Sequence, residues 1–169
     1  MGLVTLAFMT AMALAAALAQ PAVSQCLSVA GAFPDVATVA VLVGGLLLGP
    51  SEGLALGFLV GAIHVTQCGH LGLGGLLVSR AAVGLLAGLT TQRLFMEIPL
   101  VRPVAAAVGV LVCDIILFAF SPDPGLTPWL WRALGKAALS GAVSPFLFWA
   151  AFRVAAWEAG ERYRFTGFR

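Results

Sequence analysis

Three polar side chains interrupt long apolar runs of the sequence: His64, Arg80 and Asp114. A charged residue near the middle of a membrane helix costs about 2.5–3.5 kcal/mol on insertion scales, so it normally faces a bundle interior or water and has a partner. Counted along consecutive apolar segments at 1.5 Å per residue, the three residues lie roughly 6–14 Å below the same surface. We therefore predict an ion pair between Arg80 and Asp114, with His64 nearby.

Two interpretations of this polar cluster are open from the residues alone. The first is a structural ion pair that fixes how the helices pack, and it is the one we favour. The second is an outward-facing pocket that binds a small polar ligand. Both use charged side chains that face the interior of a bundle rather than lipid.

The sequence contains no pattern that predicts catalysis or metal binding. HExxH and Walker motifs are missing, and His64 and His70 are too few for a metal site without other ligands. Three cysteines without CxxC spacing argue against a metal knuckle or a redox dithiol. Cys26 and Cys68 fall near one predicted surface, where they form either a disulfide or two free thiols, and Cys113 is expected to pack inside a helix. We predict a non-enzymatic protein with no cofactor and no metal.

The composition disfavours several classes of protein. The chain has 169 residues, of which 61% are hydrophobic and 9% charged, and its mean hydropathy is +1.04. A soluble domain carries about 25% charged residues. A soluble enzyme, a nucleic-acid-binding protein and a disordered scaffold are therefore all disfavoured. The sequence predicts a single polytopic membrane domain over residues 1–169, in contact with membrane lipids and not with nucleic acid.

Apolar segments and turn signals predict an all-α integral membrane fold, a compact bundle of about six transmembrane helices. A spanning helix needs about 20 residues, and we expect helices over about residues 2–30, 35–49, 53–68, 71–91, 103–120 and 133–157. The second and third segments are short, so they either cross a thinned region of the bilayer or form a re-entrant hairpin.

Charged residues set the expected orientation. No Lys or Arg precedes the first apolar segment, so we expect a retained helix rather than a cleaved signal peptide. Cytoplasmic loops carry the excess of Lys and Arg. A six-helix topology places five arginines on one side: Arg93, Arg102, Arg162, Arg164 and Arg169. We therefore predict a multi-pass protein with both termini cytoplasmic.

Glycines recur at four-residue spacing in two of the apolar segments. Gly53, Gly57 and Gly61 lie on one face of the third predicted helix, and Gly84 and Gly88 repeat the spacing in the fourth. Such stripes let another helix backbone approach closely. Packing within the chain is the interpretation we favour, and docking of a partner helix is the alternative.

Three stretches of the sequence resemble the MreD family of rod-shape-determining membrane proteins. They are Phe33-Pro34-Asp35 before an apolar helix, the stretch from Gly57 to Ile63 (GFLVGAI), and Gly69-His70-Leu71-Gly72. The family pattern has Pro-Asp at the second helix, GFxxGxxxD in the third and a glycine-rich turn before the fourth. This chain departs from it near the end of the third helix, where His64-Val65 replaces the acidic residue.

The resemblance implies a non-enzymatic component of the bacterial machinery for cell shape and lateral cell-wall elongation, in the inner membrane. Its implied partners are an MreC-like bitopic scaffold and, directly or through that scaffold, a penicillin-binding protein and a RodA-like glycosyltransferase. The alternative is the substrate-binding S component of an energy-coupling-factor vitamin transporter. Those components are similar in length and helix number, and their outward-facing pocket suits the predicted depth of His64, Arg80 and Asp114.

Overall fold

The computed structural model describes residues 2–29, 31–68, 73–90, 101–121 and 125–166, with the side chains of residues 68, 73 and 161–166 left out. Within these ranges the chain forms six helices and no named strand. They are α1 (Leu3–Cys26), α2 (Val36–Leu48), α3 (Pro50–Cys68), α4 (Leu73–Leu89), α6 (Val101–Phe120) and α7 (Leu126–Thr166). The predicted all-helical fold is confirmed.

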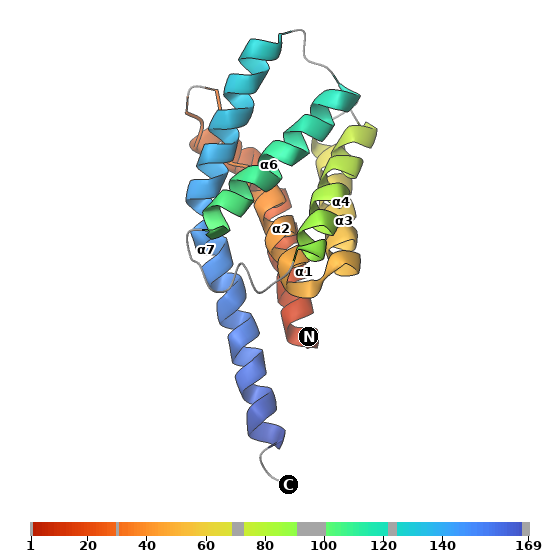
Figure 1. Cartoon of the computed structure of the whole chain (residues 1–169), viewed down its shortest axis with the longest axis vertical. Helices are drawn as coiled ribbons and strands as arrows, with labels where there is room; N and C mark the ends of the chain where they lie inside the picture. Colours follow the sequence, from red (N-terminus) through yellow and green to blue (C-terminus); the bar gives the residue numbers. More distant parts are fainter. Residues whose placement is uncertain (1, 30, 69–72, 91–100, 122–124, 167–169) are drawn as a thin grey trace.

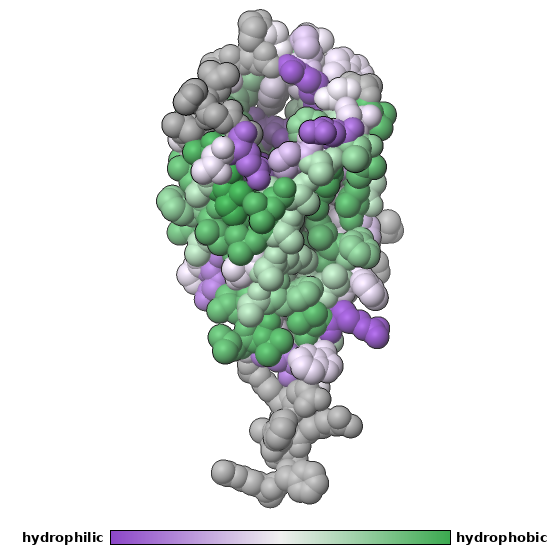
Figure 2. Space-filling model, turned by 180° about the vertical axis from the view of Figure 1, so that it is seen from behind, coloured by the Kyte–Doolittle hydropathy of each residue, from purple (hydrophilic) through white to green (hydrophobic). Residues whose placement is uncertain are grey.

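Three of the described helices are long and apolar enough to cross a membrane: Leu3–Cys26, Val101–Phe120 and the Leu126–Gly160 part of α7. Figure 1 shows that most helices run along the long axis of the molecule and that α6 crosses them obliquely. It also shows that α1 begins and α7 ends at the same end, and that the last turns of α7 project beyond the other helices. Seen from behind, apolar side chains cover the middle of the molecule and hydrophilic ones lie towards its two ends (Figure 2). This distribution is consistent with a membrane protein.

Helix α2 is the centre of the bundle. Its sequence is apolar apart from Thr38, and 11 of its 13 residues are buried. It contacts every other described helix. At 1.5 Å per residue α2 is about 20 Å long, which is shorter than the hydrocarbon core of a bilayer at about 30 Å. A helix of this length with apolar residues on all sides is typical of a buried core helix.

The turn between α2 and α3 is shorter than the sequence predicts. Gly49 is the single residue between the two helices, and it adopts a φ of 114°, which glycine reaches without steric cost. Pro50 then occupies the first position of α3, where its missing N–H leaves no bond unmade. The third helix therefore begins at Pro50, three residues before its predicted start.

Two other helix bounds differ from the predictions. Helix α1 ends at Cys26 and not near residue 30, because the chain reverses at Gly31, which has a φ of 80°, and Val29 pairs with Ala32. Helix α7 begins at Leu126 and continues to Thr166, so it exceeds the predicted range 133–157 at both ends. The expected loop between the fourth and fifth helices lies mostly in residues 91–100, outside the described residues.

Helices α3 and α4 pack against each other through glycine. A Cβ atom built on Gly53 would clash with the backbone carbonyl oxygen of Gly84, and one built on Gly84 would clash with that of Gly53. Gly57 lies against the backbone of Arg80, and a Cβ on Gly61 would lie 2.9 Å from the carbonyl oxygen of Leu76. All of these contacts are within the chain. The stripe is therefore occupied by intramolecular packing and is not open to a partner helix.

The fifth glycine of the predicted stripe, Gly88, packs differently. It lies against Gly49 and Pro50, where α2 passes into α3. A Cβ at this position would clash with the Pro50 backbone, so Gly88 keeps the end of α4 close to the turn. The two glycine runs of α3 and α4 therefore make one continuous antiparallel interface.

Candidate functional site

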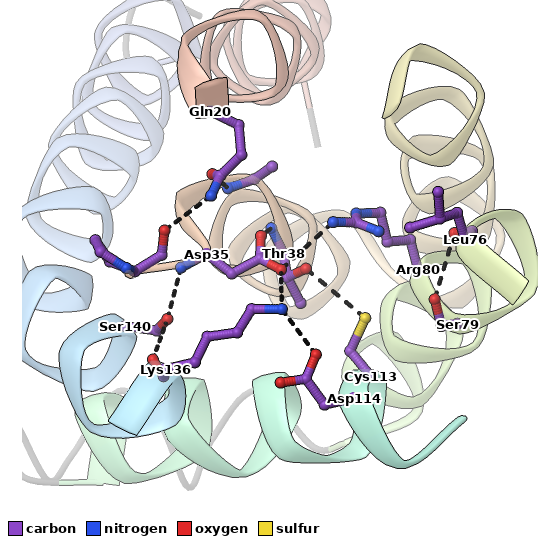
Figure 3. Close-up of polar contacts among 12 residues, drawn as sticks. Gln20, Asp35, Thr38, Leu76, Ser79, Arg80, Cys113, Asp114, Lys136 and Ser140 are labelled. Atoms are coloured by element: carbon purple, nitrogen blue, oxygen red, sulfur yellow. Dashed lines mark hydrogen bonds and ion pairs between the residues drawn. The ribbon is translucent and has the colours of Figure 1, made fainter. Parts of the chain in front are cut away.

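Four charged side chains meet inside the bundle, and Asp35 lies at their centre (Figure 3). Its Oδ2 atom is 3.4 Å from Nη2 of Arg80 on α4 and 3.2 Å from Nζ of Lys136 on α7. Lys136 also donates to Oδ1 of Asp114 on α6 at 2.7 Å. Two carboxylates and two cations make the cluster neutral, and the Asp35 side chain is only 1% exposed.

Asp35 is held in place by its position at the start of α2. Its Oδ1 atom accepts the backbone N–H of Thr38 at 2.9 Å, which is the N-cap interaction that aspartate favours. Its own backbone N–H donates to Oγ of Ser140 at 2.8 Å, and the same hydroxyl donates to the carbonyl oxygen of Lys136 at 2.7 Å. Helix α7 thus binds both the backbone and the carboxylate of this residue.

The chain reaches Asp35 by folding back along α1. Gln20 lies six residues before the end of α1, about 9 Å along the helix. Its Nε2 donates to the carbonyl oxygen of Pro34 at 2.8 Å, and its Oε1 accepts the N–H of Ala37 at 3.3 Å. Non-helical backbone at membrane depth is tolerated only where protein groups satisfy it. Gln20 does this for the connection that carries Asp35.

Replacing Gln20 by leucine should therefore lower the free energy of unfolding by about 1–3 kcal/mol, because two buried backbone groups lose their partners. Thermal unfolding in detergent micelles measures the change. Gln25→Leu is the matched control, since Gln25 lies on the same helix and is exposed. Equal stabilities of the two variants would contradict the assigned role of Gln20.

The pairing inside the cluster differs from the sequence prediction. Arg80 pairs with Asp35 and Asp114 pairs with Lys136, so the predicted Arg80–Asp114 pair is not made. Sequence reasoning placed Asp35 at the start of the second helix and Lys136 near the start of the sixth, and it assigned neither residue to the polar cluster. The structure instead starts α2 deep in the bundle and starts α7 ten residues before Lys136.

A signal for Asp35 was present in the sequence. Pro34-Asp35 before an apolar helix is a helix start, and it is part of the likeness to MreD. If Trp129 and Trp131 are counted as helical, Lys136 lies about 15 Å along a helix rather than at its start. This would have indicated that Lys136 lies inside the bundle.

His64 is the third member of the predicted cluster. It is buried, and it lies within reach of the charges of Arg80, Asp35 and Lys136. Neither nitrogen of its ring has a hydrogen-bond partner among the described residues. The structure thus places His64 beside the charged cluster without pairing it to any of the four charges.

The two cysteines whose side chains are described, Cys26 and Cys113, are both free. Cys113 is buried beside the cluster, where its Sγ accepts from Oγ1 of Thr38 at 3.8 Å. Cys26 is free and exposed, and the side chain of Cys68 lies outside the described residues. In the described part of the chain, no three or more His, Cys, Asp or Glu side chains form a group that could hold a metal ion.

An apolar cavity of about 390 Å³ lies between α2, α4 and α6. Leu42 of α2 is among its lining residues, and the walls come from α4 and α6. Leu86, Val104 and Val108 line it and are about half exposed, so the cavity opens to the surface between α4 and α6. The rest of its lining is Leu46, Val83, Ala87, Thr90, Val101, Ala105, Gly109 and Val112.

Comparisons with known proteins give no family for this chain. No protein-family model matches it, and neither a curated protein nor a solved structure does. The two features that carry an interpretation are therefore the neutral charged cluster inside the bundle and the apolar cavity that opens on its side.

Proposed function

We propose that this chain is a non-enzymatic, MreD-like component of the bacterial cell-wall elongation machinery that docks the membrane helix of an MreC-like bitopic scaffold. The observation that carries this proposal is the apolar cavity between α2, α4 and α6. It opens sideways between two helices, and its walls are hydrocarbon apart from Thr90. Small residues at Ala87 and Ala105 allow a partner helix to approach closely there.

The charged cluster supports docking over binding of a polar ligand. Asp35, Arg80, Asp114 and Lys136 are paired with one another, so their charges are neutralised within the chain. The cavity that opens to the surface offers little hydrogen-bonding chemistry to a vitamin. Both features favour a protein that binds apolar partners over the substrate-binding S component of a transporter.

The proposed setting is the bacterial inner membrane, with several passes and both termini cytoplasmic. Helix α1 begins and α7 ends at the same end of the bundle (Figure 1). Arg153 lies in the second half of α7, and Arg162, Arg164 and Arg169 follow it in the sequence. An excess of basic residues is typical of the cytoplasmic side. In this proposal the chain interacts with penicillin-binding and RodA-like proteins either directly or through the scaffold.

A photo-crosslinking amino acid at Val108 tests this proposal in the membranes of the source bacterium. We expect a covalent product with a single-span protein that carries a periplasmic domain and co-purifies with a penicillin-binding protein. The matched control is the same amino acid at Val4, an equally exposed valine on α1, away from the cavity. Products of equal yield at both sites, or recovery with an ATP-driven transport module and a small-molecule ligand, would contradict the proposal.

A further inference from the structure

Four buried nitrogen atoms beside the charged cluster have no hydrogen-bond partner among the described residues. They are Nδ1 and Nε2 of His64 on α3, and Nε and Nη1 of Arg80 on α4. His64 is 3% exposed and Arg80 is 4% exposed. Buried polar groups almost always have a partner, from the protein or from ordered water, so four together call for a physical explanation.

The two side chains converge across the α3–α4 interface. The helices are antiparallel, and Gly61 packs against Leu76 and Leu77. His64 lies about one turn beyond Gly61 on α3, and Arg80 lies about one turn beyond Leu77 on α4. Side chains on a helix lean towards its N-terminus. Both therefore lean back towards the same level, that of Gly61 and Leu77.

The unpaired atoms supply mainly donors. The Arg80 guanidinium offers N–H groups at Nε and Nη1, while a neutral imidazole offers one donor and one acceptor. A molecule that binds at these nitrogens must therefore accept several hydrogen bonds and donate one. Because the two carboxylates and two cations already cancel, an anion would add an unbalanced charge inside an apolar bundle. Water has the required donors and acceptors without that charge.

We propose that water binds at the unpartnered nitrogens of His64 and Arg80 as a buried site, where it accepts hydrogen bonds from the guanidinium and donates to the imidazole. His64 is four residues from the end of α3, about 6 Å along the helix. Arg80 then has two kinds of partner, the carboxylate of Asp35 and internal water. The site is independent of which protein the chain docks.

The substitution His64→Leu should change the Tm in opposite directions depending on whether the site holds water (a wet site) or does not (a dry site). In a wet site, His64→Leu removes the acceptor that holds the water and leaves Arg80 unpaired, so we expect the Tm to fall by roughly 2–12 °C. In a dry site, the same change removes two unpaired buried nitrogens and raises the Tm. An unchanged or raised Tm overturns the proposal. Val65→Leu, at the next position on α3, is the control and should leave the Tm within about 2 °C of the parent.

A spectroscopic measurement decides the case if His64→Leu does not fold. The chain has two histidines, so a His70→Gln protein labelled with ¹⁵N-histidine reports on His64 alone. Water-edited solid-state NMR in lipid bilayers should show transfer from water to the His64 ring nitrogens. The amide of Val60, which is fully buried on the same helix, is the internal reference. Transfer to His64 no faster than to Val60 overturns the proposal.

Discussion

Asp35→Asn should lower the free energy of unfolding by about 3–5 kcal/mol, the usual cost of removing one partner from a buried ionic group. The change leaves Arg80 and Lys136 opposite a single carboxylate, that of Asp114, so a net positive charge stays buried. Asparagine keeps an oxygen for the N–H of Thr38, and it caps helices as well as aspartate does. The measured loss therefore reports on charge and not on capping.

Three further variants identify the source of that loss: Glu52→Gln, Lys136→Met and the double variant of Asp35→Asn with Lys136→Met. Glu52→Gln removes an exposed carboxylate on α3 and should change stability by less than about 0.5 kcal/mol. Adding Lys136→Met to Asp35→Asn restores neutrality, so the double variant should lose less than the sum of the two single losses. Unfolding in detergent gives all four free energies. Additive losses, or a loss for Asp35→Asn as small as that for Glu52→Gln, would contradict an ionic role for Asp35.

The sequence contained enough to predict that Arg80 and Asp114 are buried but not which residues they pair with. Arg80 and Asp114 stand inside apolar runs, and a charge in such a run must face the bundle interior. Their partners depend on where other helices begin. Asp35 reaches the cluster because α1 and the following connection fold back, a tertiary feature held by Gln20 and Ser140. Nothing in local hydropathy reports this depth.

The helix bounds were also predicted only in part from the sequence. Glycine and proline marked the turn after α2, yet the sequence pattern did not show that one residue, Gly49, closes it. That requires a positive φ at Gly49 and a proline that begins the next helix. The apolar cavity was not predicted at all, because its lining comes from α2, α4 and α6, which are separate segments of the sequence.

Gly84→Leu should be the most disruptive change on the bundle's glycine interface, with a loss of about 3 kcal/mol, at the upper end for overpacked cores. Even a single Cβ at Gly84 would clash with the Gly53 carbonyl oxygen, and it would lie 3.0 Å from Cγ1 of Val41. Backbone cannot move aside as a flexible side chain does, so α3 and α4 must separate. Thermal unfolding of the detergent-purified protein measures the loss.

The matched control lies on the same helix. A Cβ built on Gly74 meets nothing within 4 Å, so Gly74→Leu should leave stability unchanged or raise it slightly through better helix propensity. The comparison also tests the two interpretations of the glycine stripe. If the stripe were a seam for a second chain, Gly84→Leu would abolish that association and leave the Tm of the isolated chain unaltered. A large drop in the Tm of the monomer, with no drop for Gly74→Leu, instead assigns the stripe to packing within the chain and leaves the cavity beside α6 as the docking surface.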